Sequence, residues 1–482
     1  MVTCIVAVAL TLAASPKEED YYRIVTRPIP EGLKLEVSGM ALLPDDRLAV
    51  ALRKGEVYVI NDSGDGSLTA AEYRRFATGL HEPLGLAYRD GALYTAQRTE
   101  LTRLRDLDAD GVADEYVCVA KGWGVTGNYH EYVYGPKIDH DGNFWLTLNA
   151  SIGRPLNADT AWRGWSIRVR PDGAWNPVSG GMRSPCGIGI HSTGTAFFTD
   201  QQGDWMPTNG LHHLREGVFH GYPEALRDCS RPGATFQVTE KIEQGLSFPV
   251  AVRRIDALRP PAVWFPYRKM GMSATDVVLD TTGGKFGPFA GQLFVGEFTM
   301  SQVNRVFLER VDGEYQGACF PFRRGFQCGV LRLCFDSKGT LHVGETNRGW
   351  NSLGSRSYGL EKLVWTGKTP FEIQTMEARP DGFLLTFTLP MDRQTAERVD
   401  AYALESYTYR YHQTYGSPEI DRRVLSVRGA RVGDDGRSVR LTVEGLRDGY
   451  VHELRLSGVR ARSGNELLHP VGFYTLNRIP SE

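Results

Sequence analysis

The sequence predicts an all-β protein: a six-bladed β-propeller followed by a small immunoglobulin- or fibronectin-like β-sandwich. Three observations lead to this prediction. Six segments repeat one pattern of short apolar strands joined by turns with Asp or Gly, helical periodicity is weak throughout, and the character of the chain changes near Pro370. Short strands at regular spacing with turn signals between them are typical of propellers and sandwiches.

The repeated unit predicts the propeller. Its first copies read "SGMALLPDDRLAVALRKGEVYVI" and "LGLAYRDGALYTAQRTELTRL", and its last reads "GVLRLCFDSKGTLHVGETNRGW". The first four copies start about 46 to 52 residues apart, which is propeller-blade spacing, and an insertion from about Asp204 to Met270 precedes the fifth. A unit that cannot bury its faces alone must stack on its neighbours, so six units are expected to close radially over residues 20–368.

The segment 370–482 predicts the sandwich. It contains "FLLTFTLPMD", "SVRLTVEGL" and "HELRLSGVRARSGN", which are short alternating strands with turn signals. All the candidate site residues precede this segment. We therefore expect the sandwich to be a spacer or a stabilising appendage, and its deletion to leave a working propeller.

The N-terminal stretch predicts export. "MVTCIVAVALTLAASPKEE" has an apolar run from Val2 to Leu12 followed by small residues, which fits a signal peptide over residues 1–15. We expect the mature protein in the periplasm or outside the cell. Six cysteines would then remain, and their pairing stays open.

Net charge and hydropathy argue against a nucleic-acid partner and against a transmembrane segment. The formal net charge of −2 offers no basic face for phosphates, so nucleic acid is not an expected partner. No run of about 18 apolar residues follows the N-terminal stretch, so the sequence predicts no transmembrane segment.

The stretch "DLDADGVADEY" predicts a calcium site. Asp106, Asp108, Asp110, Gly111 and Asp114 follow the pattern D-x-D-x-D-G-x-x-D, the front of an EF-hand-like loop. Alternating acids converge when a cation cancels their repulsion, and the glycine permits the sharp turn. The expected ion has a structural role; the alternative is a solvated acidic hairpin tip.

Four further segments resemble, in order, landmarks of the glucose/sorbosone dehydrogenase family. They are "YHEYVYGPKIDHDGNFWLT", "GGMRSPCGIGI", "TDQQGDWMPTNGLHHLREGVFHGYP" and "GQLFVGEFTMSQVNRVFL". The resemblance implies an exported six-bladed propeller that uses pyrroloquinoline quinone and calcium to oxidise a sugar or polyol. It is closest to the "membrane-bound dehydrogenase" branch, which often carries a cytochrome c module. This chain has no CxxCH motif, so an external electron acceptor such as a cytochrome is expected.

The resemblance also implies catalytic residues. The family's catalytic base is a histidine just before a blade strand, and His130 takes that place; its alternative is a loop-capping histidine. Arg183 in "GMRSP" matches the arginine that polarises the quinone oxygens; its alternative is a structural ion pair. Ser184 replaces an asparagine that contacts the cofactor in the family. A serine hydroxyl can still donate a hydrogen bond, but it reaches less far.

Other cofactor and metal positions follow from the same resemblance. Gln202, Gly203 and Asp204 stand where the family binds the calcium of the cofactor site. Trp264 would stack on the flat quinone, its alternative being an ordinary core tryptophan. Arginines of the late blades would meet the cofactor's carboxylates, Arg305 being the one we assign, with Arg332 and Arg348 as further candidates.

Two other functions stay open. A metal-dependent lactonase or hydrolase would need a cluster of acids and amides at the tunnel mouth, for which Glu131, Asn149, Asp200 and Glu297 are candidates. A non-catalytic propeller that binds carbohydrate or another protein would need neither a base nor a cofactor. Ser184, the missing cytochrome module and a weak basic cradle favour this last possibility.

Overall fold

The structure is a computed structural model that describes residues 15–61, 72–153 and 160–481. The predicted signal peptide therefore lies almost entirely outside the described residues. No helix in the described part of the chain is long and apolar enough to cross a membrane. The six cysteines between residues 118 and 334 are all free thiols.

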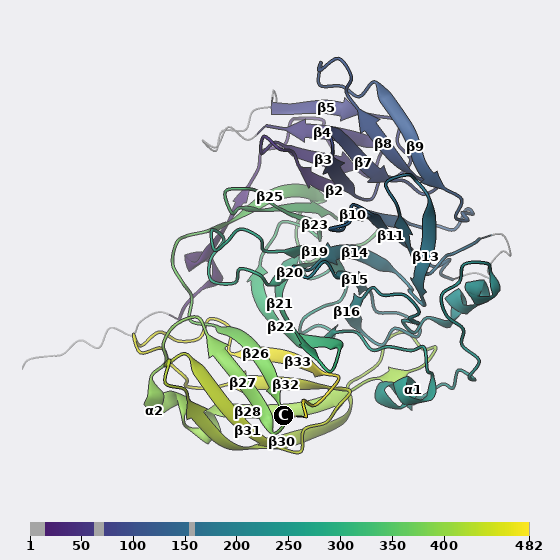
Figure 1. Ribbon diagram of the computed structural model, residues 1–482. Helices are drawn as coiled ribbons and strands as arrows, with labels where there is room; N and C mark the ends of the chain where they lie inside the picture. Colours follow the sequence, from purple (N-terminus) through teal and green to yellow (C-terminus); the bar gives the residue numbers. More distant parts are fainter. Residues whose placement is uncertain (1–14, 62–71, 154–159, 482) are drawn as a thin grey trace, which may run out of the picture.

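The prediction of an all-β propeller is confirmed (Figure 1). Three four-stranded antiparallel sheets follow one another along the first part of the chain. The first contains β2 (Val37–Leu42), β3 (Leu48–Leu52), β4 (Glu56–Ile60) and β5 (Tyr73–Ala77). The second contains β6 (Leu86–Arg89), β7 (Ala92–Ala96), β8 (Glu100–Arg105) and β9 (Glu115–Lys121). The third contains β10 (Val133–Ile138), β11 (Phe144–Leu148), β12 (Trp165–Val169) and β13 (Trp175–Gly180).

Two more four-stranded sheets follow, and one of them joins the two ends of the propeller. The fourth contains β14 (Pro185–Ile190), β15 (Ala196–Asp200), β16 (Asn209–His213) and β18 (Val263–Phe265). The other contains β23 (Val330–Phe335), β24 (Leu341–Thr346), β25 (Tyr358–Trp365) and β1 (Tyr22–Thr26), which follows η1 (Glu18–Asp20). Because β1 pairs with β25, the start of the described chain closes the ring.

The small residue that opens each repeat allows the inner strands to approach closely. A side chain on Gly39 of β2 would lie 2.5 Å from the backbone of Gly85, which precedes β6. One on Gly85 would lie 2.1 Å from the carbonyl oxygen of Gly135 in β10. Glycine is required where two backbones come this close. These contacts are part of a closed ring in which β2, β6, β10, β14, β19 and β23 each contact the next.

The remaining propeller strands belong to a larger sheet. β19 (Ala274–Leu279), β20 (Leu293–Glu297), β21 (Gln302–Val311) and β22 (Glu314–Arg324) pair in sequence, and β22 pairs onward with β33 (Val471–Leu476) at the end of the chain. Five blades are therefore separate four-stranded sheets, while these four strands are the beginning of an 11-stranded sheet.

The C-terminal segment, which we call the C-terminal module, has its own core but not its own sheet. Its elements are β26 (Ile373–Arg379), β27 (Gly382–Phe387), α2 (Arg393–Ala396), η4 (Val399–Ala401), β28 (Tyr402–Thr408), β29 (Arg410–Tyr411), β30 (Ile420–Val432), β31 (Ser438–Glu444), β32 (Tyr450–Leu456) and β33. Their order after β22 is β33-β32-β28-β30-β31-β27-β26. An immunoglobulin-like sandwich is not confirmed, because this sheet continues a blade.

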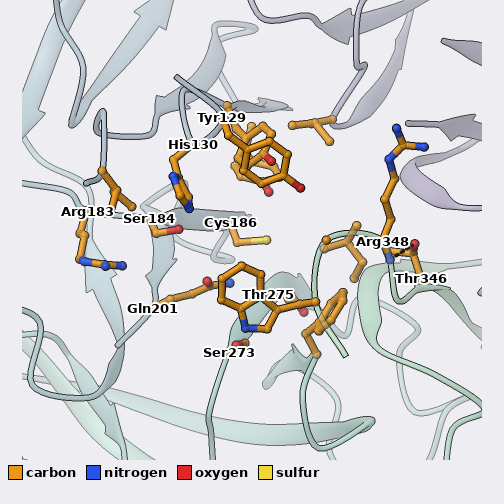
Figure 2. A pocket seen from close by; sticks show the side chains of 18 of the residues that line it. Tyr129, His130, Arg183, Ser184, Cys186, Gln201, Ser273, Thr275, Thr346 and Arg348 are labelled. Atoms are coloured by element: carbon orange, nitrogen blue, oxygen red, sulfur yellow. Dashed lines mark hydrogen bonds between the residues drawn. The ribbon is translucent and has the colours of Figure 1, made fainter. Parts of the chain in front are cut away.

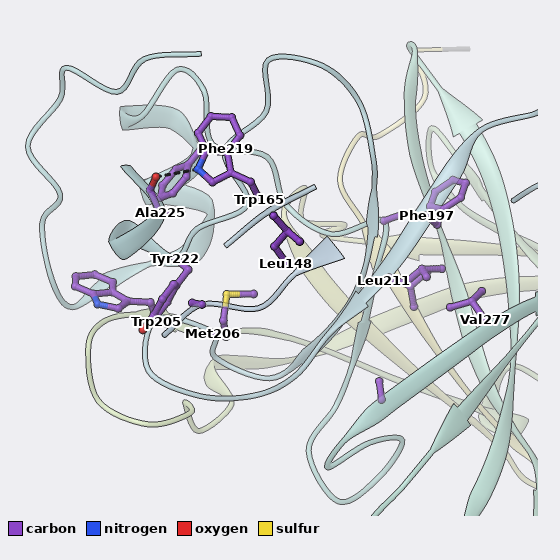
Figure 3. Close-up of a cluster of buried hydrophobic side chains, with 14 of the residues drawn as sticks. Leu148, Trp165, Phe197, Trp205, Met206, Leu211, Phe219, Tyr222, Ala225 and Val277 are labelled. Atoms are coloured by element: carbon purple, nitrogen blue, oxygen red, sulfur yellow. Dashed lines mark hydrogen bonds between the residues drawn. The ribbon is translucent and has the colours of Figure 1, made fainter. Parts of the chain in front are cut away.

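The insertion after Asp204 packs against the propeller and the C-terminal module. It carries η3 (Pro223–Ser230), β17 (Leu246–Ser247) and α1 (Phe248–Arg254). Figure 3 shows Trp165 of β12 pointing toward η3, where its indole N–H donates to the carbonyl oxygen of Ala225 at 3.0 Å. The same buried cluster includes Trp205, Met206 and, from the C-terminal module, Tyr407, Tyr409 and Tyr411. One core therefore joins the insertion to both parts.

Candidate functional site

The ends of the inner strands surround one cavity, which we call the mouth pocket. It has a volume of about 160 Å³ and is open to solvent. Most of its wall comes from residues before or at the start of the first strand of a blade and from residues at or after the end of the second strand. Among them are His130, Arg183 and Ser184 on one side and Thr346 and Arg348 on the opposite side (Figure 2).

His130 lies in the turn before β10, and this turn is fixed by hydrogen bonds. The backbone N–H of His130 donates to Oδ1 of Asn128 at 2.9 Å, and its carbonyl oxygen accepts from the N–H of Tyr132 at 2.7 Å. Burial, then the charges of Arg183 and Arg98, lower the pKa of His130 below its usual value. A histidine with a lowered pKa is neutral at pH 7 and can accept a proton.

Arg183 and Ser184 reach the same pocket from the turn before β14. Their backbone N–H groups donate to the two carboxylate oxygens of Asp200, each at 2.8 Å. Nε of Arg183 donates to Oδ1 of Asp204 at 2.6 Å. Asn149 donates to Oγ of Ser184 at 3.3 Å. The structure thus brings together the three residues that the sequence placed in adjacent loops.

Of the arginines that line the mouth pocket, sequence reasoning assigned Arg183, named Arg348 as a candidate and missed Arg53. Arg53 and Arg348 line the mouth pocket together with Arg183. Arg53 follows β3 and Arg348 follows β24, each the second strand of its blade. Arg348 donates to Oε2 of Glu36 at 2.7 Å, and Arg53 donates to Tyr132 at 2.6 Å. Gln201 occupies the equivalent place in the fourth blade. A polar residue just after the second strand of a repeat is therefore the sequence signal that could have identified Arg53 as a pocket residue.

The lining contains no aspartate or glutamate among the described residues. Some acids near it pair with its arginines, and two buried acids accept backbone hydrogen bonds. Glu297 accepts from the N–H groups of Met272, Ser273 and Met300, and Asp200 accepts from those of residues 183, 184 and 201. Burial raises the pKa of Glu297 to about 7 and that of Asp200 to about 6. These carboxylates hold the loops in place.

The other acid and amide considered for a hydrolase are also engaged elsewhere. Glu131 is buried and accepts hydrogen bonds from the hydroxyl groups of Thr126 and Ser151. Asn149 is buried behind Ser184 and does not line the pocket. The four residues named for a metal cluster therefore do not face the mouth pocket as a ligand set.

Trp264 does not lie in the mouth pocket, so its predicted contact with a cofactor there is wrong. It is on β18, the outermost strand of its blade, where the insertion brings the chain against the C-terminal module. Its ring packs edge-on against Phe248 at 5.0 Å and Tyr409 at 5.4 Å between ring centres. Its backbone N–H donates to Oγ1 of Thr475 at 2.8 Å.

Arg305 is likewise placed away from the mouth pocket. Its side chain is fully buried on β21, with the guanidinium carbon 4.1 Å from the ring centre of Phe289 and 4.3 Å from that of Phe320. It donates to Gln292 and to the carbonyl oxygens of Ile373 and Gln374. Arg305 therefore fastens the C-terminal module to a blade and is not available to a cofactor.

Arg332, the remaining late-blade candidate, does not line the mouth pocket. It is buried and donates from Nε to the carbonyl oxygen of Ser38 at 2.8 Å and from Nη2 to that of Leu84 at 3.1 Å. Its guanidinium also lies over the ring of Tyr134. Arg332 therefore links its own inner strand to other blades and is engaged by backbone acceptors.

The segment Gln202–Asp204 does not offer the ligand set of a calcium site. The carbonyl oxygen of Gly203 accepts from the N–H of Gly416 at 2.9 Å, and the side chain of Gln202 donates to the carbonyl oxygen of Pro207. Asp204, the sole carboxylate of the three residues, is paired with Arg183. A cation would have to displace an arginine there, so these residues do not fit calcium.

The acidic loop between β8 and β9 does gather carboxylates. Asp106, Asp108 and Asp114 each place an oxygen within 4.8 Å of the others, but Asp110 is not part of this group. The carboxylate of Asp110 instead accepts from the N–H of Val112 at 2.7 Å. The loop lies at the outer strand of the second blade, away from the mouth pocket.

Comparisons with known proteins place this fold. The sequence matches no curated protein. A putative oxidoreductase (glucose dehydrogenase) from Thermus thermophilus has a TM-score of 0.51 at 20% identity, over 71% of this chain and 100% of its own. A Carbohydrate-Active Enzymes Family AA12 protein from Trichoderma reesei has a TM-score of 0.51 at 13% identity, over 76% of this chain and 100% of its own.

At such low identity these structures establish a shared fold and nothing further. The family described as "Domain of unknown function (DUF7133)" matches residues 34–318. That match spans more than half of the 482 residues, from the first inner strand into the middle of β22. The chain therefore belongs to the DUF7133 family.

Proposed function

We propose that this protein is a quinone-linked oxidoreductase that oxidises a sugar or polyol, with pyrroloquinoline quinone bound in the mouth pocket. One observation carries the proposal: three arginines line a pocket that has no acidic residue in its described wall, and a neutral histidine lies beside one of them. The quinone is flat and carries carboxylates, so aromatic walls and guanidinium groups suit it. Four motifs that resemble the glucose/sorbosone dehydrogenase family, and neighbours named glucose dehydrogenase that share the fold, support the same chemistry.

The residues of the pocket divide into holding and proton-accepting roles. When bound, the quinone would supply a two-electron acceptor for hydride. Arg348 would hold a carboxylate from the side opposite His130, and Arg53 would add a positive charge beside Tyr129 and Tyr132. Arg183 would donate from its terminal nitrogens, because its Nε is already bonded to Asp204. His130 would accept the proton of the reacting hydroxyl group.

A non-catalytic carbohydrate-binding propeller is the second candidate. The observation that favours it is the exposure of aromatic rings around the mouth pocket, with Tyr129 48% and Trp350 57% exposed. Exposed aromatic side chains at a pocket bind ligands without any need for a base. A metal-dependent lactonase is not favoured, because the carboxylates of the inner loops accept backbone hydrogen bonds.

Several features outside the pocket complete the proposal. The acidic loop would bind a structural calcium ion through Asp106, Asp108 and Asp114, since carboxylate oxygens are the ligands that calcium prefers. We count β19–β22 as the sixth blade, supported by the contacts of β19 with β14 and β23. The chain would divide near residue 370 into the propeller and a sandwich-like module. It would be exported, and would pass electrons to an external acceptor such as a cytochrome.

The function is tested on purified protein with added quinone and calcium. We expect quinone absorbance to follow the protein through gel filtration and aldoses to reduce a redox dye. His130→Gln should retain quinone and lower turnover by about a hundredfold to ten-thousandfold, because glutamine cannot accept the proton. His140→Gln, in an exposed turn, is the matched control and should keep wild-type turnover.

Arg183→Lys separates binding from catalysis. Lysine keeps the charge but loses the planar pair of donors, so weaker quinone binding and slower turnover are both expected. A wild-type protein that never retains the quinone would overturn the proposed function. Equal rates for His130→Gln and wild type would remove His130 from the chemistry.

A further inference from the structure

Exposed aromatic side chains gather at one place on the protein. Four aromatic residues in the described part of the chain are exposed, namely Tyr116, Tyr129, Trp350 and Tyr415. The last three line the mouth pocket, although they come from distant parts of the sequence. An aromatic face in water is costly unless a ligand covers it, so three such faces around one pocket form a binding surface.

Tyr415 comes from the C-terminal module, for which the sequence predicted no site. It lies in the loop 411–417, and this loop is fixed to the propeller at both ends. The N–H of Gly416 donates to the carbonyl oxygen of Gly203, and the N–H of Ser417 donates to that of Pro207, each at 2.9 Å. At the other end the N–H of Trp205 donates to the carbonyl oxygen of His412 at 2.9 Å.

Further contacts hold the base of the loop. β29 pairs with β17 of the insertion, and the hydroxyl group of Tyr411 donates to the carbonyl oxygen of Gly221 at 2.6 Å. Within the loop, Nε2 of His412 lies 2.9 Å from the carbonyl oxygen of Gly416 and closes the turn. These contacts anchor the loop, and Tyr415 lies at the pocket with 64% of its surface exposed.

The ring of Tyr415 lies next to the catalytic residues assigned above. The guanidinium carbon of Arg183 is 5.6 Å from the centre of the ring. A substrate whose reacting hydroxyl group lies between His130 and Arg183 would therefore have the ring of Tyr415 close by. The other two exposed rings, Tyr129 and Trp350, stand at the same opening.

We propose that the C-terminal module completes the mouth pocket, and that Tyr415 is a specificity-determining residue which binds the sugar unit next to the reacting one. The substrate is accordingly an oligosaccharide. Sugar rings present apolar C–H faces that pack on aromatic faces, and one reacting sugar ring does not cover three of them. This substrate class rests on the proposed function, but binding to the aromatic rim does not need the quinone.

The test measures binding without cofactor. Calorimetric titration of the quinone-free protein with maltotriose, cellotriose and xylotriose, each beside its monosaccharide, should show that at least one trisaccharide binds more tightly than its monosaccharide. Tyr415→Ala should weaken that trisaccharide about tenfold or more and leave monosaccharide binding within about twofold. Tyr415→Phe should bind nearly as wild type, because the ring face is kept.

Controls and outcomes separate this inference from the proposed function. Tyr116→Ala removes an exposed tyrosine on β9, far from the pocket, and should change nothing. If no trisaccharide binds more tightly than its monosaccharide, or if Tyr415→Ala binds as wild type, the inference is wrong. Trisaccharide binding that depends on Tyr415, in a protein that never binds quinone, would support the inference and reject the quinone-linked function.

Discussion

Acidification should destabilise this protein through buried histidines, and His212 gives the sharpest test. It lies on β16, fully buried, with its ring stacked on Phe198 at 4.9 Å and edge-on to His220 at 5.4 Å. Neither ring nitrogen has a hydrogen-bond partner among the described residues. Burial lowers the pKa of His212 to about 3, and that of His452, in the C-terminal module, also to about 3.

The sign and size follow from proton binding. Below pH 6.5 the unfolded chain binds a proton at His212 that the folded protein does not bind, so the free energy of unfolding decreases as the pH decreases. Between pH 7.5 and 5.0 a histidine with a folded pKa near 3 accounts for a loss of about 2 kcal/mol. His212 and His452 together should therefore remove about 4 kcal/mol over that interval.

The perturbation is His212→Phe, which keeps a flat ring against Phe198 and removes the titrating group. Urea unfolding followed by tryptophan fluorescence at pH 7.5 and 5.0 gives the acid-induced loss for each protein. The loss in the variant should be about 2 kcal/mol smaller than in wild type, whatever the variant's stability at pH 7.5. The exposed His140→Gln should show the full wild-type loss. An unchanged loss in His212→Phe would refute the reasoning.

Three further predictions test the assignments of the structure. The sequence alone led us to expect that deleting residues 370–482 leaves a working propeller. The structure reverses this expectation: the truncation should be insoluble, because β22 loses its partner β33 and Tyr-rich core surface becomes exposed. A soluble truncation that melts like wild type would contradict this. Arg305→Ala should cost about 3 kcal/mol or more in urea unfolding, since three buried acceptors lose their donor, while quinone retention per folded molecule stays at the wild-type level. Calcium at a hundredfold excess over its dissociation constant should stabilise wild type by about 2.7 kcal/mol in calorimetry. Asp106→Asn should abolish this stabilisation, whereas Asp110→Asn should keep it. Equal melting of wild type with calcium and with chelator would exclude the site.

The propeller could be predicted from the sequence because its signals are local. Alternating apolar runs and turns with Asp or Gly are read within about 20 residues, and the glycine at the start of a repeat has one steric cause, the close approach of neighbouring inner strands at Gly39 and Gly85. His130, Arg183 and Ser184 come together for a related reason: each precedes the first strand of its blade, and all such turns are at the same end of a propeller.

What could not be predicted depends on contacts between distant segments. Strand alternation does not distinguish an inner strand from an outer one, so nothing in "AVWFPYRK" indicated that Trp264 is on the outermost strand of its blade. β29 pairs with β17 across more than 150 residues of sequence. Each of these strands has two residues, which is too few for a periodic signal in the sequence. Tyr415 therefore reaches the mouth pocket through contacts that have no counterpart in local sequence.

The charge of the mouth pocket follows from how the loops are built. Each inner loop needs acceptors for its backbone N–H groups, and buried carboxylates such as Asp200 and Glu297 supply them at the ends of the second strands. An acid used in this way faces the loop and is lost to the pocket wall. Arginines that follow second strands, such as Arg53 and Arg348, line the pocket and pair with acids outside its wall, Glu82 and Glu36. The described wall of the pocket therefore presents three arginines and no carboxylate, which suits an anionic ligand and opposes a metal-based hydrolase.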